Sequence, residues 1–405
     1  MDRINLIRNQ LKGCPFNFDK TNPKDPVIVF AVRSPITKAK RGGLNSTYPE
    51  EILSQLFSYL ISTTKISPEE ISEVIIGNAL QDGCGFVSSR AAQRMAGIPE
   101  TVPLYVVNRL CNSGLQAIID ANNAIKSDEN KIIIAGGVES MSLNNFGNML
   151  NEKLINKETL LTNTFVKDLI TPMGITNENI CEKFGISREK QDSFAYESHM
   201  KATQALKENK FEKEILPIIT RDKKKIDKDD IIRPETTIQS LSKLKPVFKS
   251  NGTTTAGNAS PLSDGGAICL LMSKRMATKF KLQVMGKIIG YSVVGVPSEI
   301  MGIGPSVAIP AVLKMAGLTY KDIDLFEINE AFAGQAIYCI EKLGLPKDKV
   351  NVHGGAIALG HPLGCTGARM IVAMLNQLKI YKKKRGIVSM CVGTGMGAAC
   401  IIERE

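Results

Sequence analysis

Two cysteines and one histidine lie in segments whose composition suits covalent chemistry. Cys111 follows an apolar run and precedes an amphipathic stretch at residues 113–126, between an expected strand and an expected helix. A thiol there meets the positive end of the helix dipole and free backbone N–H groups. We therefore predict a nucleophile whose pKa lies below the free-thiol value of about 8.5. The same position also suits an unreactive buried cysteine, which is the commoner use of the residue.

His361 is one of three histidines and lies in a segment rich in glycine, residues 354–367. Glycine is used where the backbone must approach another group closely or take unusual dihedral angles. Pro362 fixes the next φ angle and stiffens how the imidazole is presented. The segment is consistent with a catalytic base, and equally with a loop histidine held by hydrogen bonds.

Cys391 ends the apolar run at residues 386–390 and precedes a glycine cluster that begins at Gly393. A thiol beside exposed glycine N–H groups suits an acid/base group next to an oxyanion hole. A dinucleotide-binding loop is excluded because too few residues follow to form the helix and strand that it needs. A zinc site lacks the usual Cys-x-x-Cys pairs, so we expect no metal; its ligands would be His361, Cys365, Cys391 and Cys400.

Two further segments are candidates for contacts with a ligand. Asn329 follows the apolar run 325–328, where an amide can orient a water or donate to an oxyanion. The alternative is a turn-forming or helix-capping Asn. Ser260 ends a loop of small residues, 255–260, which suits either a cover over a flat ligand or a tight connection.

The elements that must position these residues follow one pattern twice. Buried strands are predicted at 27–30, 74–76 and 132–135 and again at 325–328 and 386–390, with helices at 113–126 and 367–379. Capping patterns at Ser67 and Thr319 indicate further helix starts. Asn78 precedes Cys111 by 33 residues, and Asn329 precedes His361 by 32. We expect two related α/β halves, each on a mostly parallel sheet, with the active site where they meet.

The expected domain organisation has four parts. Residues 1–24 form an N-terminal tail, and residues 25–149 form the N-terminal half, which about 248–283 complete. Residues 150–247 are richer in Lys, Glu and Asn and include a helix at 187–207, so we predict an inserted, largely surface loop domain. Residues 284–405 form the C-terminal half.

The composition limits which classes of binding partner we expect. The 405 residues carry a net charge of +11, which suits an acidic partner such as a phosphorylated small molecule. Nucleic acid is not expected, because aromatic residues make up only 5% and no Trp is present to stack on bases. No apolar run reaches the roughly 18 residues of a membrane span. Nine cysteines without paired spacing indicate a reducing compartment.

The N-terminus contains a pattern that resembles the type 2 peroxisomal targeting signal. Its members are Arg3, Ile4, Gln10 and Leu11. The alternative is an ordinary polar tail, while the C-terminal residues Glu403–Glu405 do not match the Ser-Lys-Leu signal.

Five segments together resemble the motifs of the thiolase family, in the family's order. They are Asn108-Arg-Leu-Cys-Asn-Ser-Gly-Leu-Gln116, Gly136-Gly-Val-Glu-Ser-Met-Ser142, Asn329-Glu-Ala-Phe-Ala333, Gly360-His-Pro-Leu-Gly-Cys-Thr-Gly367 and Cys391-Val-Gly-Thr-Gly-Met-Gly397. The resemblance covers residues 27–402 and is strongest to the peroxisomal 3-ketoacyl-CoA thiolase branch, through residues 172–199 and 294–305. It implies a five-layer αβαβα fold with a loop domain, a homodimer, a peroxisomal location and an import receptor for the N-terminal signal.

The resemblance also implies a role for each site residue. Cys111 matches the acylated nucleophile, His361 its base and Cys391 a second acid/base. Asn329, through a water, and His361 would form one oxyanion hole, while the N–H groups of Cys111 and Gly393 would form the other. Ser260 would touch the pantetheine of coenzyme A, which is a substrate; no permanently bound cofactor is implied.

Thiolytic cleavage of 3-ketoacyl-CoA in fatty acid β-oxidation is the expected reaction, and two alternatives stay open. A short-chain, acetoacetyl-CoA-forming thiolase would use the same residues, and the loop domain would decide the chain length. A thiolase-like acyl carrier without turnover would lose catalytic positions, whereas this chain keeps Cys111, His361 and Cys391.

Overall fold

The apolar runs fold into two β-sheets in a computed structural model that describes residues 22–145, 147, 156–163 and 166–405. The predicted targeting segment therefore lies outside the described residues. The N-terminal sheet has the order β1-β8-β5-β3-β4, with β2 paired to β8, and the C-terminal sheet has the order β10-β11-β12-β9. The N-terminal strands are β1 (Pro26–Arg33), β2 (Thr37–Lys38), β3 (Glu73–Gly77), β4 (Leu104–Val107), β5 (Ile132–Ser140) and β8 (Ser263–Ser273). The C-terminal strands are β9 (Lys287–Gly295), β10 (Leu325–Ile328), β11 (Arg385–Val392) and β12 (Met396–Glu403).

The two sheets repeat one another in order and direction. β5 pairs with β3 in parallel as β11 pairs with β10, and β8 is antiparallel to β1 and β5 as β12 is to β9 and β11. A parallel bridge between Phe326 and Val350 takes the place of the β3–β4 pairing. Two related halves are thus confirmed. As expected, most strands of each sheet run in one direction, but β8 and β12 are reversed and lie antiparallel to both neighbours, so both sheets are mixed.

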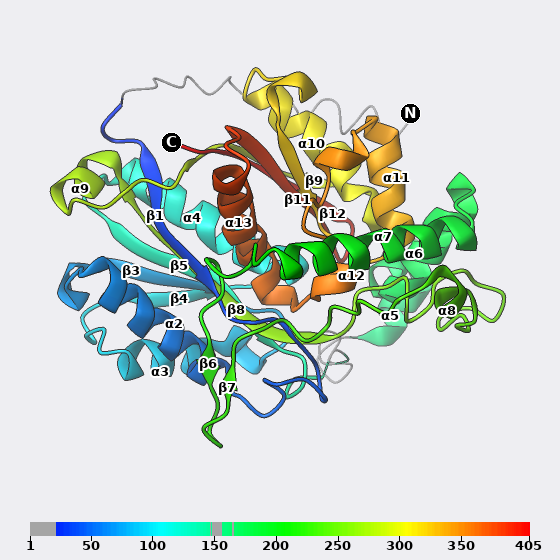
Figure 1. Cartoon of the computed structure of the whole chain (residues 1–405), viewed down its shortest axis with the longest axis horizontal. Helices are drawn as coiled ribbons and strands as arrows, with labels where there is room; N and C mark the ends of the chain where they lie inside the picture. Colours follow the sequence, from blue (N-terminus) through cyan, green and yellow to red (C-terminus); the bar gives the residue numbers. More distant parts are fainter. Residues whose placement is uncertain (1–21, 146, 148–155, 164–165) are drawn as a thin grey trace.

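Helices form the other three layers of the sandwich (Figure 1). α4 (Ser113–Ser127) and α13 (Leu363–Ile380) lie between the sheets and share one core with their facing sides. A second core covers the outer face of the N-terminal sheet, and a third covers that of the C-terminal sheet. The outer helices are α2 (Pro49–Thr64), α3 (Phe86–Met95) and α9 (Lys274–Lys279) on one side and α10 (Gly304–Met315) and α11 (Ala333–Leu343) on the other. This is the expected five-layer fold.

The first turn of α13 lies against the N-terminal half at backbone distance. A Cβ on Gly137 of β5 would fall 1.9 Å from the carbonyl oxygen of Gly364, and one on Gly114 of α4 would fall 2.5 Å from the same oxygen. A Cβ on Gly367 would fall 2.4 Å from the backbone nitrogen of Leu115. Only glycine allows such approach. The beginnings of α4 and α13, which follow Cys111 and His361, therefore lie together.

The segment between the halves is mainly helical. Its elements are α5 (Lys157–Thr162), α6 (Met173–Phe184), α7 (Arg188–Lys207), the β6 (Ile218–Ile219) and β7 (Lys225–Ile226) pair and α8 (Ile238–Ser242). Arg33 of β1 anchors this segment: its fully buried guanidinium lies 2.8 Å from Glu214 Oε1 and 2.7 Å from Asp229 Oδ1. Removing one partner of such a buried set leaves an uncompensated charge, at a cost of about 3–5 kcal/mol. The predicted domain boundaries stay a prediction.

Two expected helix starts are wrong. The capping patterns at Ser67 and Thr319 lead only to the three-residue 3-10 turns Pro68–Glu70 and Tyr320–Asp322. The chain enters β3 and β10 within three residues of these turns, so no room is left for an α-helix.

Candidate active site

A tight turn presents Cys111 at the entrance to α4. Leu110 has a φ of 48°, in the left-handed region that non-glycine residues rarely adopt. Its N–H donates to Asn108 Oδ1 (2.9 Å), and the hydroxyl of Ser113 donates to the Leu110 carbonyl (2.6 Å). The Ser113 hydroxyl also accepts the N–H of Arg109 (2.9 Å). Backbone strain of this kind persists only where the surroundings fix it, and it is common at functional sites.

The predicted low pKa of Cys111 is wrong. Burial raises the pKa of this thiol to about 11, although the N–H groups of Gly393 and of Cys111 itself oppose the shift. The side chain packs against Leu80 and Leu363 in a small apolar cluster. Desolvation of the thiolate therefore outweighs the two N–H groups. The geometry nevertheless brings Gly393 to the sulfur, as the expected oxyanion hole requires.

His361 is held in one tautomer. Its Nδ1 lies 2.7 Å from the hydroxyl of Thr366, which itself donates to the Pro362 carbonyl (2.9 Å). Because that hydroxyl has one proton, it must accept from Nδ1–H, and Nε2 keeps its lone pair. Burial, with a smaller effect of Arg369, lowers the pKa of His361 to about 3. The imidazole is thus neutral and presents Nε2 as a base.

Asn329 and Cys391 come from adjacent strand ends. β10 and β11 pair Ile328 with Ser389, and the N–H of Asn329 donates to the Ser389 carbonyl (2.9 Å). Asn329 Nδ2 lies 3.3 Å from His361 Nε2, so the amide donates to the free lone pair. Asn329 Oδ1 is buried and has no hydrogen-bond partner among the described residues. This orphaned acceptor fits an amide that holds a water or substrate group.

Cys391 is fully buried and packs against Met301 and Ala331. Burial raises the pKa of its thiol well above the ordinary value, and the neighbouring Cys111 adds to this shift. The two thiols therefore feel each other's charge across the site. A protonated Cys391 at neutral pH can donate a proton to a carbanion formed beside Cys111.

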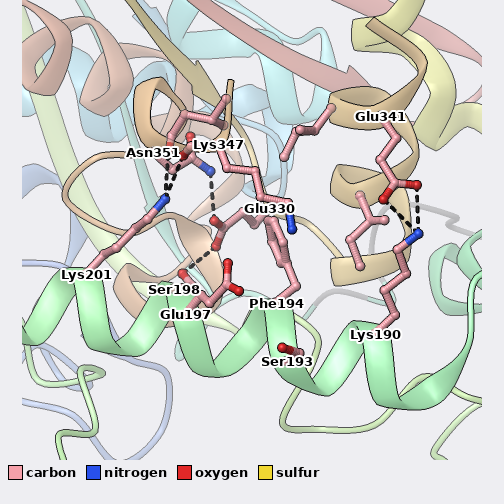
Figure 2. Close-up of a pocket in the computed structure, with 13 residues that line it drawn as sticks. Lys190, Ser193, Phe194, Glu197, Ser198, Lys201, Glu330, Glu341, Lys347 and Asn351 are labelled. Atoms are coloured by element: carbon pink, nitrogen blue, oxygen red, sulfur yellow. Dashed lines mark hydrogen bonds and ion pairs between the residues drawn. The ribbon is translucent and has the colours of Figure 1, made fainter. Parts of the chain in front are cut away.

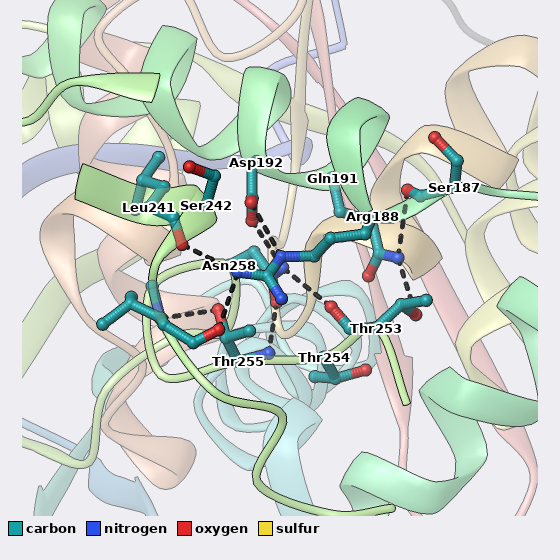
Figure 3. Close-up of polar contacts among 12 residues, drawn as sticks. Ser187, Arg188, Gln191, Asp192, Leu241, Ser242, Thr253, Thr254, Thr255 and Asn258 are labelled. Atoms are coloured by element: carbon teal, nitrogen blue, oxygen red, sulfur yellow. Dashed lines mark hydrogen bonds and ion pairs between the residues drawn. The ribbon is translucent and has the colours of Figure 1, made fainter. Parts of the chain in front are cut away.

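A polar network holds the loop that carries Ser260 (Figure 3). Asn258 Nδ2 donates to Asp192 Oδ1 (2.9 Å), and Arg188 Nε donates to Asp192 Oδ2 (2.7 Å). Glu178 of α6 accepts the N–H of Thr254 (2.7 Å). Ser260 itself donates its hydroxyl and its N–H to the Ala331 carbonyl, both at 3.0 Å. The loop is thereby fixed beside the segment that follows Asn329.

Glu139 is a residue of the site region that sequence reasoning did not single out. It is fully buried and accepts the N–H groups of Ala79 (2.9 Å) and Gly364 (3.0 Å). Burial raises its pKa to about 7. It joins the loop after β3 to the first turn of α13, three residues beyond His361. A carboxylate inside an otherwise apolar strand was the available signal.

The expected residues thus surround one place, where the turn before α4 meets the ends of β10 and β11 and the loop before α13. Two thiols, a neutral imidazole and N–H donors at one place suit cysteine-dependent acyl transfer. Within the described ranges, no group of three or more His, Cys, Asp or Glu side chains could hold a metal ion.

The family follows from comparison with known proteins. The model of the thiolase N-terminal domain matches residues 26–275, and that of the thiolase C-terminal domain matches residues 282–404. The chain therefore belongs to the thiolase family. It is 49% identical to the mouse 3-ketoacyl-CoA thiolase A, peroxisomal, over 100% of this chain and 99% of the relative. It is 46% identical to the human 3-ketoacyl-CoA thiolase, peroxisomal, over 100% and 99% of the two chains.

Solved structures agree with this assignment. The dimeric peroxisomal thiolase of Saccharomyces cerevisiae matches with a TM-score of 0.91 and 46% identity, over 98% of this chain and 100% of that one. The human mitochondrial 3-ketoacyl-CoA thiolase in complex with CoA matches with a TM-score of 0.84 and 36% identity, over 94% and 98%.

The raised pKa of Cys111 predicts how the free enzyme reacts with iodoacetamide. Only the thiolate is alkylated, so the rate should rise about tenfold per pH unit between about pH 7 and 10. Mass spectrometry of the Cys111 peptide measures this rate, with Cys111→Ser as the control for the other thiols. A plateau already reached near pH 8 would show that the thiol has a low pKa after all.

Proposed function

We propose that the chain cleaves 3-ketoacyl-CoA with free CoA, through an acyl thioester on Cys111. The main support for this proposal is that the Cys111 sulfur lies near the N–H of Gly393 and beside a second, buried thiol, that of Cys391. A hydrolase or a simple acyl carrier has no use for that second thiol. The products are acetyl-CoA and an acyl-CoA shortened by two carbons, as in fatty acid β-oxidation.

The first half of the cycle breaks the carbon–carbon bond. His361 Nε2 takes the proton of Cys111, whose sulfur attacks the 3-keto carbon of the substrate. The oxyanion that forms accepts from the N–H groups of Cys111 and Gly393. When it collapses, the bond between the α and β carbons breaks, and its electron pair forms the enolate of acetyl-CoA. The enolate takes the proton of Cys391 at carbon, and acetyl-CoA leaves.

The second half transfers the acyl group. Free CoA enters, and its thiol gives its proton to the Cys391 thiolate while its sulfur attacks the acyl-Cys111 carbonyl. The same two N–H groups stabilise this second oxyanion, and the shortened acyl-CoA leaves as the Cys111 sulfur is released. The proton from the CoA thiol restores the Cys391 thiol, and the proton that His361 took from Cys111 returns to the Cys111 sulfur. This gives ping-pong turnover with a covalent intermediate.

The side chains of Asn329 and His361 can stabilise the enolate that forms in the first half of the catalytic cycle. The amide and imidazole lie 3.3 Å apart, and the unpartnered Asn329 Oδ1 can accept from a water that in turn donates to the enolate oxygen. Ser260 bonds the carbonyl of Ala331, two residues after Asn329, and its hydroxyl oxygen can accept from the pantetheine amide of CoA. The net charge of +11 favours CoA phosphates. No step uses a resident cofactor.

The enzyme is peroxisomal, in line with its curated relatives from mammals, yeast and plants. We propose that an import receptor recognises Arg3, Ile4, Gln10 and Leu11, which fit the type 2 targeting pattern. Residues 1–20 fused to a fluorescent reporter should then enter peroxisomes, and the fusion with Arg3→Ala and Leu11→Ala should stay cytosolic. A wild-type fusion that stays in the cytosol would end this proposal.

A homodimer is supported by an exposed apolar face beside β4. This strand pairs only with β3 among the described residues, so its other edge is free. Val87, Met95 and Phe86 of the adjoining α3 are 79%, 59% and 46% exposed. An apolar face next to an unpaired strand edge is a typical association surface. The S. cerevisiae structure described above is that of a dimeric enzyme.

Val87→Asp should therefore convert the dimer to a monomer, because it places a charge in an apolar interface. Sedimentation velocity would report about half the mass of the wild-type particle. Val247→Asp is the matched control, since Val247 is 58% exposed in the loop domain and should leave the dimer intact. An unchanged mass for Val87→Asp would place the interface elsewhere.

Cysteine variants test the assigned chemistry. With a medium-chain 3-ketoacyl-CoA and no free CoA, the wild-type protein should gain the shortened acyl group on Cys111, detected by mass spectrometry. Cys111→Ala should gain none. Cys391→Ala should still be acylated by a simple acyl-CoA but should lose about 100-fold or more in carbon–carbon bond cleavage, the scale of a lost acid/base group. Full cleavage by Cys391→Ala would remove its assigned role.

A further inference from the structure

A pocket between α7 and α11 has a buried carboxylate as its floor (Figure 2). This group is Glu330, which is 1% exposed and directly follows Asn329. One oxygen accepts from the Ser198 hydroxyl (2.7 Å) and the Ile357 N–H (3.2 Å), and the other accepts from Asn351 Nδ2 (2.7 Å). Three donors face the carboxyl group, so it acts as an acceptor at both oxygens. Burial nevertheless raises its pKa.

The contact with Asn351 holds the chain on both sides of Asn329. Asn351 Oδ1 accepts the N–H of Ile328 (2.8 Å), and its Nδ2 donates to the Ile328 carbonyl (2.9 Å) as well as to Glu330. Residues 328 and 330 are therefore fastened to one side chain. These hydrogen bonds therefore fix the backbone on both sides of Asn329 and so set the direction of its side-chain amide.

The other oxygen of Glu330 reaches the segment that leads to His361. The N–H of Ile357 belongs to α12 (Ala356–Leu359), which ends two residues before the histidine. A Cβ on Gly355 would fall 2.2 Å from the carboxyl carbon of Glu330, so this backbone lies directly on the carboxylate. One side chain thus touches the segments that carry both Asn329 and His361.

Ser198 connects Glu330 to the loop domain. Its hydroxyl accepts the N–H of Gly355 (3.1 Å) and donates to Glu330, so it bridges the two. Ser198 lies on α7, whose Lys201 also donates to the carbonyls of Val350 (2.8 Å) and Lys347 (3.2 Å) (Figure 2). α7 therefore supports both Glu330 and the segment from residue 347 to residue 355.

We propose that Glu330 is a positioning residue, which sets Asn329 Nδ2 against His361 Nε2, and that Ser198 ties this geometry to the loop domain. The inference rests on the proposed function, in which those two groups stabilise the enolate. Glu330 and Ser198 would act only through Asn329 and His361. A shift of about 1 Å in such a pair costs on the order of 100-fold in rate.

Glu330→Gln tests the proposal, because the amide keeps the shape but turns two donors toward the surrounding donors. The readout is the ratio of two acylation rates of Cys111, one from a 3-ketoacyl-CoA and one from acetyl-CoA. Only the first reaction forms an enolate. The ratio should fall about tenfold or more while KM changes less than about twofold. Glu341→Gln is the control, since Glu341 lies at the same pocket but its carboxylate bonds only Lys190 among the described residues.

Ser198→Ala keeps the test valid if Glu330→Gln does not fold. It should lower the same ratio by about threefold to tenfold, the scale of one lost hydrogen bond. Ser193→Ala, on the exposed side of the same helix, should match the wild type. Variants that lower the melting temperature but leave the ratio unchanged would reduce Glu330 to a structural role and overturn the proposal. A wild-type protein that forms no adduct would instead refute the proposed function.

Discussion

The close backbone contact between α13 and the N-terminal half is the constraint on which the site depends. Gly114 and Gly137 leave room for the carbonyl of Gly364, and Glu139 binds the N–H of that same residue. An added methyl group at either glycine would push the helix outward. Because His361 lies three residues before Gly364, such a shift would move the base away from Cys111. The proposed pair of Cys111 and His361 thus depends on a backbone contact between the two halves at the first turn of α13.

Burial dominates the electrostatics of this place. It raises the pKa of Cys111 to about 11 and lowers that of His361 to about 3, so both groups are neutral in the free protein. In the proposed mechanism, thiolate and imidazolium form together and stabilise each other, next to N–H groups that can receive the charge of the oxyanion. A resting site of neutral groups protects a nucleophilic sulfur from adventitious electrophiles.

Motif and spacing predicted much of this arrangement, and the misses have physical causes. The nearly equal intervals, 33 residues from Asn78 to Cys111 and 32 from Asn329 to His361, reflect the repeat that the two sheets display. The antiparallel direction of β8 was not predictable, because a continuously buried strand reads alike in either direction. The pKa of Cys111 was misjudged, since its apolar neighbours come from distant segments such as Leu363. Glu139 was overlooked because its partners, the N–H groups of Ala79 and Gly364, are backbone groups that only the tertiary fold brings to it.

The repeat of the two sheets has a consequence for what each copy does. The pairing of Gly77 with Gly137 corresponds to that of Ile328 with Ser389, so Asn78 is the counterpart of Asn329 and Glu139 that of Cys391. In the second copy these positions hold Asn329 and Cys391 of the proposed active site. In the first they face inward: Asn78 donates to the Val138 carbonyl (2.8 Å), and Glu139 grips the neighbouring half. The internal repeat therefore uses two equivalent pairs of positions differently. One pair belongs to the proposed active site, and the other pair holds the two halves together.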